Sequence, residues 1–218
     1  MRSQKLRGLY LVVPVGAPLE RVEAALRGGV DVLQLWQPAD VSRDEARRWG
    51  RTVRGLARRF GVPLLVHEDV ALARELGADG VHLDGEIPTP DAVRNELGRG
   101  ALVGYTCGRV LKKAEWAERV GADYISFCAV FPSPSAPEAC ELVPLETVRE
   151  AKRRLKIPVF ASGGITPENV AKVLKTGADG VAVVSAVLDA PDPEAAARAF
   201  KAQLEPLKLE ETRGRDDR

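Results

Sequence analysis

The chain has 218 residues, of which 45% are hydrophobic and 29% are charged, and its formal net charge is +1. This length is enough to bury a large core without disulfides or metal ions, and the charge balance gives no field for nucleic acid or an anionic membrane. No apolar run approaches the ~18 residues of a membrane span, and the opening MRSQKLRG lacks the apolar centre of a signal peptide. Cys107, Cys128 and Cys140 lie far apart without zinc-type spacing, so we expect reduced thiols in a cytoplasmic protein.

Eight short apolar strands are expected along the chain. In chain order they cover residues 9–13, 33–35, 62–66, 81–83, 101–104, 125–127, 157–161 and 181–184. Most of them lack the apolar/polar alternation of a half-exposed strand. Such continuous runs are typical of strands buried on both faces, as in a parallel sheet.

Helical patterns lie between the strands. The first is expected behind Pro18, because proline is favoured in a first helical turn. Ser42 and Glu45 have the spacing of a capping box at the start of another helix. Thr166 is expected to cap a later helix whose apolar residues begin at Val170.

A short motif recurs four times, ending in an aspartate at residues 31, 79, 123 and 179. Each copy carries glycine before the aspartate and a buried strand after it, which indicates a joint between a helix and a strand. Consecutive copies are about 44 to 56 residues apart, a spacing that suits two strand–helix units per interval.

The pattern predicts an α/β fold, a single (β/α)8 TIM barrel over residues 1–204, with a charged and unstructured tail over 205–218. An open doubly wound sheet is the alternative. It would usually carry a GxGxxG motif after its first strand, and this chain has Val13-Pro14-Val15-Gly16 there.

Active sites of such barrels lie at the carboxyl ends of the strands. Gly163 and Gly164 follow the seventh strand, and their backbone N–H groups can approach an anion closely. Val184 and Ser185 open a short helix after the eighth strand, where negative charge is favoured. We therefore expect a phosphate site, with a simple tight turn at the two glycines as the alternative.

Acidic residues follow the third and fourth strands. Two carboxylates on adjacent strand ends are the usual protein share of a Mg²⁺ site that also takes phosphate oxygens. We expect Glu68 and Glu86 to be these ligands, with Asp69 and Asp84 as neighbouring candidates. The alternative is that these acids are solvated or cap helices.

The only two histidines are His67 and His82. His67 is a candidate general base, together with Glu68 as a catalytic carboxylate. His82 lies within an apolar run, so we expect a hydrogen-bonded interior residue. Cys107 has no basic neighbour in the sequence and is not expected to be a nucleophile.

In this order and spacing, the motifs resemble those of the thiamine phosphate synthases and their thiazole tautomerase relatives over about residues 8–204. The segments that carry the resemblance are Leu9–Val12, Gln34-Leu35, Gly77–Leu83, Gly121–Ile125, Val130–Pro132, Gly163–Asn169 and Gly177–Ala186. The resemblance implies a Mg²⁺-dependent transfer. An aminopyrimidine pyrophosphate ionises, the nitrogen of a thiazole phosphate captures the cation, and pyrophosphate is released.

The resemblance also implies roles for single residues. Gln34 matches a glutamine of the pyrimidine side, and Ser133 and Ser135 stand where the family usually has threonines that touch the thiazole. Gly163 and Gly164 match its phosphate-binding turn, and Val184 and Ser185 match its second backbone contact. Thr106, at the end of the fifth strand, is a further candidate for binding substrate.

The chain departs from the family on the pyrophosphate side. The family carries Gln-Leu-Arg-Glu-Lys after its second strand, and its Arg and Lys positions hold Trp36 and Pro38 here. Ala136 stands at a third lysine position, and Gly108 at the catalytic histidine of the tautomerases. Candidate replacement cations beyond the fifth strand are Arg109, Lys112 and Lys113.

Three functions therefore stay open. The first, which we take as the working hypothesis, is a divergent thiamine phosphate synthase-like transferase of thiamine biosynthesis whose pyrophosphate site is degraded. The second is a thiazole phosphate isomerase-like enzyme with His67 or Glu68 as base. The third is a non-catalytic barrel that binds thiazole phosphate or thiamine phosphate, and a homo-oligomer is left open.

Overall fold

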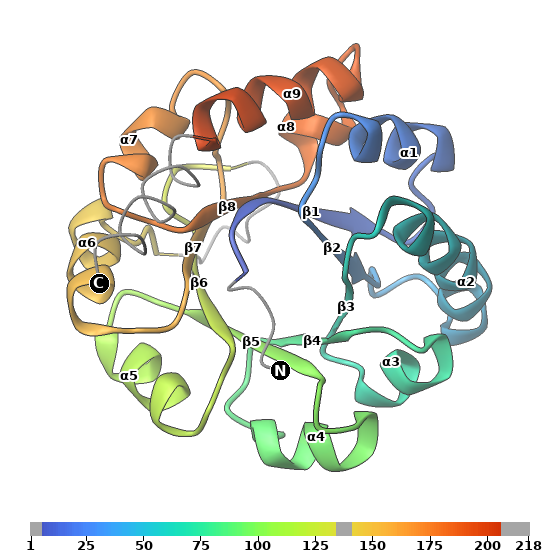
Figure 1. Cartoon of the computed structure of the whole chain (residues 1–218), viewed down its shortest axis with the longest axis horizontal. Helices are drawn as coiled ribbons and strands as arrows, with labels where there is room; N and C mark the ends of the chain where they lie inside the picture. The colour runs from blue at the N-terminus through green and yellow to red at the C-terminus, as the bar shows by residue number, and fades with distance from the viewer. Residues whose placement is uncertain (1–5, 134–140, 206–218) are drawn as a thin grey trace, which may run out of the picture.

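The computed structural model describes residues 6–133 and 141–205, in which eight parallel strands close into a barrel surrounded by helices (Figure 1). The strands are β1 (Gly8–Pro14), β2 (Val32–Trp36), β3 (Leu64–His67), β4 (Gly80–Leu83), β5 (Leu102–Cys107), β6 (Tyr124–Cys128), β7 (Val159–Ser162) and β8 (Gly180–Val183). Each strand pairs with the next, and β1 also pairs with β8, which closes the sheet. The (β/α)8 barrel expected from the sequence is confirmed.

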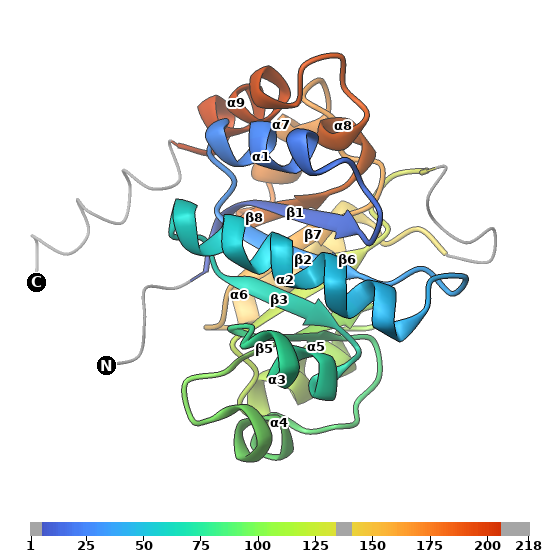
Figure 2. The ribbon, with the colours of Figure 1, turned by 90° about the vertical axis from the view of Figure 1, so that its right-hand side faces the viewer.

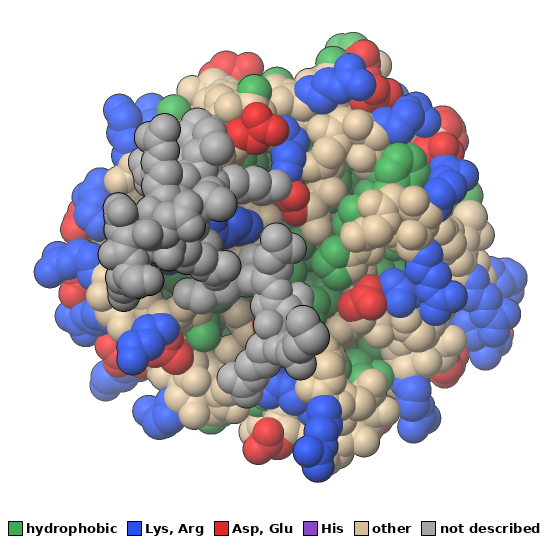
Figure 3. All heavy atoms as spheres, in the orientation of Figure 1, with side chains coloured by type: hydrophobic (Ala, Val, Ile, Leu, Met, Phe, Trp, Pro, Cys, Tyr) green, Lys and Arg blue, Asp and Glu red, His purple; other side chains and the backbone are tan. Residues whose placement is uncertain are grey.

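Helices cover the outside of the barrel, and their outer faces carry charged side chains of both signs (Figure 3). In the described part of the chain they are α1 (Leu19–Arg27), α2 (Arg43–Phe60), α3 (Val70–Leu76), α4 (Pro90–Leu97), α5 (Leu111–Arg119), α6 (Leu145–Arg154), α7 (Val170–Leu174), α8 (Ser185–Leu188) and α9 (Pro193–Leu204). None of these helices combines the length and the apolar character that crossing a membrane requires.

Two predicted helix starts have different outcomes. Ser42 caps α2, and its hydroxyl accepts a hydrogen bond from the Glu45 N–H at 3.3 Å, as the capping-box spacing predicts. The prediction for Thr166 is wrong, because Asn169 occupies the N-cap position of α7. The Asn169 side chain accepts from the Thr166 N–H at 2.9 Å and donates to the Gly164 carbonyl at 2.8 Å. It therefore ties the preceding loop together instead of capping the helix.

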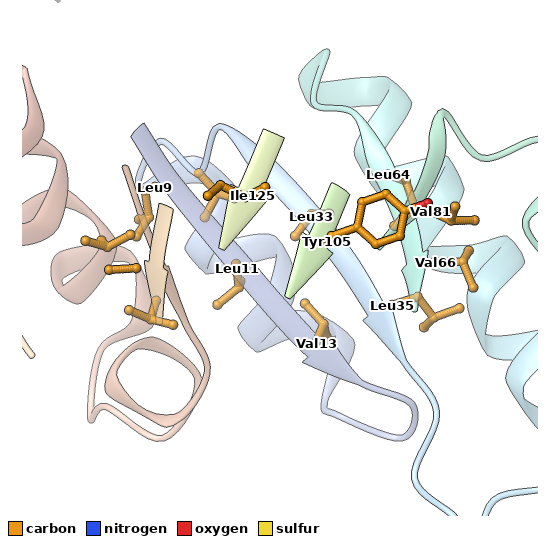
Figure 4. Close-up of a cluster of buried hydrophobic side chains, with 14 of the residues drawn as sticks. Leu9, Leu11, Val13, Leu33, Leu35, Leu64, Val66, Val81, Tyr105 and Ile125 are labelled. Atoms are coloured by element: carbon orange, nitrogen blue, oxygen red, sulfur yellow. The ribbon is translucent and has the colours of Figure 1, made fainter. Parts of the chain in front are cut away.

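Apolar side chains pack on both faces of the strands, as their continuous apolar runs predict. Leu9, Leu11 and Val13 of β1 belong to the cluster between strands and helices (Figure 4). A second cluster fills the inside of the barrel and consists of Tyr10, Val32, Leu65, Tyr124, Phe160 and Ala182. The barrel is therefore a packed core and not a pore.

The four repeated aspartates explain the internal repeat of the sequence. Each precedes an even-numbered strand, and its carboxylate accepts a hydrogen bond of 2.8 Å from a backbone N–H at the start of the preceding odd-numbered strand. For Asp31, Asp79, Asp123 and Asp179 the donors are Leu9, Leu64, Val103 and Val159. The same carboxylates bind, at 2.6 or 2.7 Å, the cations Lys201, Arg54, Arg94 and Lys152. Each aspartate thus joins two strands and a helix. For Asp79, Asp123 and Asp179 this helix precedes the two strands, and for Asp31 it is α9, the last helix of the chain.

We expect Asp179→Asn to lower the free energy of unfolding by about 1.5–3 kcal/mol, the range for hydrogen bonds to charged groups. The Asp179 side chain is 12% exposed and loses its charge-assisted bonds to Val159 and Lys152. Asp44→Asn is the control, because Asp44 pairs with Arg47 on the surface and is 66% exposed. Its effect should stay below about 0.5 kcal/mol. Urea denaturation measures both losses, and equal losses would contradict the role given to the repeat.

Candidate active site

Polar side chains gather toward the carboxyl ends of the strands, the face where barrels of this kind carry their sites. The arrowheads of β1 and β3 point to this side in Figure 2. Gln34, His82 and Ser126 are buried there, above the aromatic layer formed by Tyr10, Tyr124 and Phe160. The structure therefore places polar groups over an apolar floor.

A chain of hydrogen bonds crosses this layer. The Tyr10 hydroxyl donates to Gln34 Oε1 at 2.6 Å and lies 2.9 Å from the Tyr124 hydroxyl. The Tyr124 hydroxyl lies 2.8 Å from His82 Nδ1, and His82 Nε2 lies 2.8 Å from Thr106 Oγ1. The chain thus connects β1, β2, β4, β5 and β6.

The direction of these hydrogen bonds follows from counting protons. Tyr10 gives its one hydroxyl proton to Gln34, so Tyr124 has to donate to Tyr10, and the Nδ1–H of His82 has to donate to Tyr124. Burial lowers the pKa of His82 to about 3, so its ring is neutral, and Nε2 lies 2.8 Å from a Thr106 hydroxyl that also hydrogen-bonds Asp84. Gln34 therefore keeps its amide NH₂ for a ligand, since no acceptor for that nitrogen is found among residues 6–133 and 141–205.

Sequence reasoning missed Tyr10 and Tyr124, because both lie in apolar strands and look like ordinary core residues. A fully buried tyrosine hydroxyl still needs a partner, which is the signal that could have identified them. His82 is the interior, hydrogen-bonded residue expected from the sequence. Cys107 is buried, and burial raises the pKa of its thiol to about 12, in agreement with the expectation that it is not a nucleophile.

A second group of side chains lies at the ends of β3 and β4. Ligand atoms of His67, Glu68 and Asp84 all lie within 4.8 Å of one another. His67 Nε2 is 3.1 Å from Asp84 Oδ2, and this hydrogen bond holds the pKa of the Asp84 carboxyl well below its ordinary value. The Asp84 N–H donates to the Glu68 carboxylate. Glu68 has a φ of 61°, an uncommon conformation for a residue other than glycine, which aims its side chain at this group.

The neighbouring acids have other positions. Asp69 caps α3, accepting from the Leu72 N–H at 2.7 Å, and also binds Arg43 at 2.6 Å. Glu86 is exposed, and the group of possible metal ligands in the described residues contains Asp84 instead. The geometry thus pairs Glu68 with Asp84, and a metal role for Glu86 stays a prediction.

The turn after β7 can only be built from glycine. Gly163 and Gly164 have φ values of 87° and 65°. A Cβ on Gly164 would lie 2.3 Å from the Pro132 carbonyl oxygen and 2.8 Å from Phe131 Cβ. The loop after β6 therefore packs directly on this turn, and the Phe131 N–H donates to the Gly163 carbonyl at 3.1 Å.

The other site residues predicted from the sequence lie at the end of β8 and in the loop after β6, and they differ in exposure. Val184 is half-buried and Ser185 is exposed at the start of α8, as expected for the end of the eighth strand. Ser133 is half-buried at the end of the described loop after β6. Ser135 and Ala136, for which we predict a thiazole contact and a lost lysine, lie outside the described residues, as does Cys140.

The buried neutral His82 makes the stability of the protein depend on pH. Its pKa falls from an ordinary 6.5 to about 3 on folding, so the unfolded chain binds more protons between these values. The free energy of unfolding should therefore fall by roughly 2 kcal/mol from this residue between pH 6.5 and 4.5. Urea denaturation at a series of pH values measures this slope. The variant His82→Gln should lose the contribution of His82 to the dependence of the unfolding free energy on pH. An unchanged slope in the variant would contradict a neutral interior His82.

A family model, two sequence relatives and a solved structure all indicate the same family for this chain. Residues 9–187 match the family model described as thiamine monophosphate synthase. The chain is 46% identical over 210 residues to a thiamine-phosphate synthase of Thioalkalivibrio sulfidiphilus, covering 93% of this chain and 98% of that protein. It is 42% identical over 207 residues to one of Aromatoleum aromaticum, covering 92% and 98%. A solved thiamine phosphate pyrophosphorylase of Pyrococcus furiosus superposes with a TM-score of 0.81 at 32% identity, covering 92% and 96%.

Proposed function

The chain belongs to the thiamine monophosphate synthase family, and from that premise we propose that it joins an aminopyrimidine pyrophosphate to a thiazole phosphate and releases pyrophosphate. The observation that carries this function is the match over residues 9–187, which spans every candidate site residue. The family expected from the sequence and its thiamine-phosphate synthase function are thereby confirmed, whereas a degraded pyrophosphate site stays a prediction. No specific observation on the described residues favours the isomerase or the non-catalytic barrel.

The proposed reaction makes limited demands on the protein. The bond between the pyrimidine methylene carbon and the pyrophosphate oxygen breaks, and both electrons leave with that oxygen. The lone pair of the thiazole nitrogen then forms the new carbon–nitrogen bond. No proton is removed from either reacting atom, so the site has to bind, orient and stabilise charge. We therefore assign His67 to orienting Asp84, and a general-base role belongs only to the alternative isomerase.

The thiazole phosphate is proposed to bind at the ends of β7 and β8. Within the described chain, no hydrogen-bond acceptor is found for the N–H groups of Gly164 and Ile165. Backbone N–H groups without an internal partner are suited to phosphate oxygens. Val184 and Ser185 would add a second contact, and Ser133 would lie beside the thiazole ring.

The pyrimidine is proposed to bind over the aromatic floor of the barrel. Gln34 offers its NH₂ as donor to a ring nitrogen of the pyrimidine, because its carbonyl oxygen is already bonded to Tyr10. Thr106 Oγ1 lies 2.8 Å from His82 Nε2, also hydrogen-bonds Asp84, and can accept a further hydrogen bond through a remaining lone pair. This donor and this acceptor suit a base that carries both a ring nitrogen and an amino group.

The site also fits a Mg²⁺ ion at the ends of β3 and β4. Mg²⁺ is usually held by one or two carboxylates together with substrate phosphates. Glu68 and Asp84 would supply these carboxylates, and the low pKa of Asp84 keeps it ionised. When bound, the ion supplies positive charge to the pyrophosphate. His67 would keep Asp84 oriented, as second partners of metal ligands do.

We further propose that the protein works in the cytoplasm on phosphorylated small molecules. In the described residues Cys107 is a free thiol, as a reducing compartment favours. The formal net charge of +1 is in line with small-molecule substrates and gives no support to a nucleic-acid partner.

The direct test is synthesis of thiamine phosphate by the purified protein with both substrates and Mg²⁺. We expect thiamine phosphate and pyrophosphate in equal amounts, and no product from Gly164→Asp, whose side chain collides with Pro132 and adds negative charge. Gly55→Asp is the control, because a Cβ at Gly55 meets nothing within 4 Å. Absence of thiamine phosphate from the wild type would refute the function. Isomerised thiazole phosphate, or a thermal shift without turnover, would then favour one of the two alternatives.

Tyr10→Phe should release the Gln34 amide from its fixed orientation. We expect the KM for the pyrimidine substrate to rise roughly 2- to 12-fold, which corresponds to about 0.5–1.5 kcal/mol for one neutral hydrogen bond, and the KM for thiazole phosphate to stay near the wild-type value. Tyr105→Phe is the matched control, since its hydroxyl donates to the Pro88 carbonyl at 2.7 Å, away from the chain of hydrogen bonds. Steady-state kinetics measures both KM values for each variant. A similar rise in the KM for the pyrimidine substrate in Tyr10→Phe and Tyr105→Phe would show a general loss of packing.

A further inference from the structure

The proposed leaving group is a polyanion, and one wall of the site has no cation to receive it. Trp36 ends β2 and Pro38 lies in the loop that follows. An open depression of about 590 Å³ lies against this loop, the turn after β3 and α4. None of the nine residues that line the depression is lysine or arginine, and Glu68, Asp69 and Glu96 carry negative charge there. This wall therefore supplies no side-chain cation of its own to pyrophosphate.

Two arginines near the rim are already engaged. The Arg43 guanidinium binds Asp69 at 2.6 Å and Glu75 at 3.0 Å, so its charge is neutralised by two carboxylates. Arg109 is 50% exposed and pairs with Glu141 at 3.3 Å. Neither contact points toward the carboxylates of Glu68 and Asp84.

Lys113 has a different position. It is the third residue of α5, is half-buried, and its Nζ donates to the carbonyl oxygen of Asp84. No carboxylate lies within ion-pair distance of Nζ in the part of the chain that the structure describes. The positive charge of Lys113 also acts on Cys107, the last residue of β5. Burial raises the pKa of the Cys107 thiol, and the Lys113 ammonium opposes that rise. An unneutralised cation thus lies beside a proposed metal ligand.

The placement of this lysine is unfavourable for the helix itself. The first turn of α5 contains Lys112 and Lys113 and no acidic residue, and α5 has no side-chain cap. Cations near a helix N-terminus oppose the helix dipole, so neither lysine stabilises α5. Lys112 is exposed, whereas Lys113 turns toward Asp84. The contact of Lys113 is therefore not explained by the stability of its own helix.

We propose that Lys113 binds the pyrophosphate leaving group, in place of the arginine and lysine that the family resemblance leads us to expect after the second strand. The inference rests on the proposed function. On binding, Nζ exchanges the Asp84 carbonyl oxygen for a pyrophosphate oxygen, while the carboxylates of Glu68 and Asp84 remain available to Mg²⁺. Charge then develops on the leaving group next to a fixed cation, which stabilises the transition state.

The test uses pyrophosphate itself, with Mg²⁺ present, in isothermal titration calorimetry on the whole protein. Lys113→Met keeps most of the stem and removes the charge, and Lys112→Met is the matched control in the same helical turn. We expect the Kd for pyrophosphate to rise at least tenfold in Lys113→Met and less than twofold in Lys112→Met. Lys113→Arg should retain most of the affinity. A thermal unfolding curve for each variant checks that α5 remains folded.

Kinetics adds a second readout. For Lys113→Met the KM of the pyrimidine pyrophosphate should rise and kcat should fall, with the KM of thiazole phosphate within about twofold of wild type. Wild-type pyrophosphate affinity in a folded Lys113→Met, or equal losses in both methionine variants, would overturn the assignment. If the wild type makes no thiamine phosphate but only Lys113→Met loses pyrophosphate, the anion site stands and the proposed function fails.

Discussion

Four aspartate side chains hold the barrel together at the ends where its strands begin. Each one accepts a backbone N–H from one strand, directly precedes the next strand and neutralises a cation from a helix, as Asp179 does with Val159 and Lys152. The repeat fixes the register of the sheet at that end. These aspartates join strands and helices at the amino ends of the strands. The residues at the carboxyl ends are therefore not needed for these contacts and can serve in binding and catalysis.

The inside of the barrel connects the two ends. Tyr10, Tyr124 and Phe160 fill its middle, and the tyrosine hydroxyls then become the first polar groups of the site. Gln34 and His82 are almost completely buried, and each is hydrogen-bonded to one of these hydroxyls. A connected polar layer of this kind is rigid. It presents a donor at β2 and an acceptor at β5 before any ligand arrives, which lowers the cost of binding.

Much of the fold could be predicted from the sequence, because eight apolar runs and a repeated aspartate are local signals. The capping of α2 was also predictable from Ser42, whereas the loop-tying role of Asn169 depends on the Gly164 carbonyl several residues away. The pairing of Glu68 with Asp84 was not predictable either. It depends on the left-handed backbone of Glu68 and on a neighbouring strand. The family match supplies the reaction, and the structure supplies the partners of each side chain.

A crystal structure with thiazole phosphate, pyrophosphate and Mg²⁺ bound tests the central claim most directly, because it locates both anions at once. The account predicts the thiazole phosphate on the backbone N–H groups of Gly164 and Ile165. It predicts the pyrophosphate within hydrogen-bond distance of Lys113 Nζ, with the metal between it and Glu68 and Asp84. Phosphate bound away from the turn after β7, or pyrophosphate seated against Trp36 and Pro38 without Lys113, would contradict it.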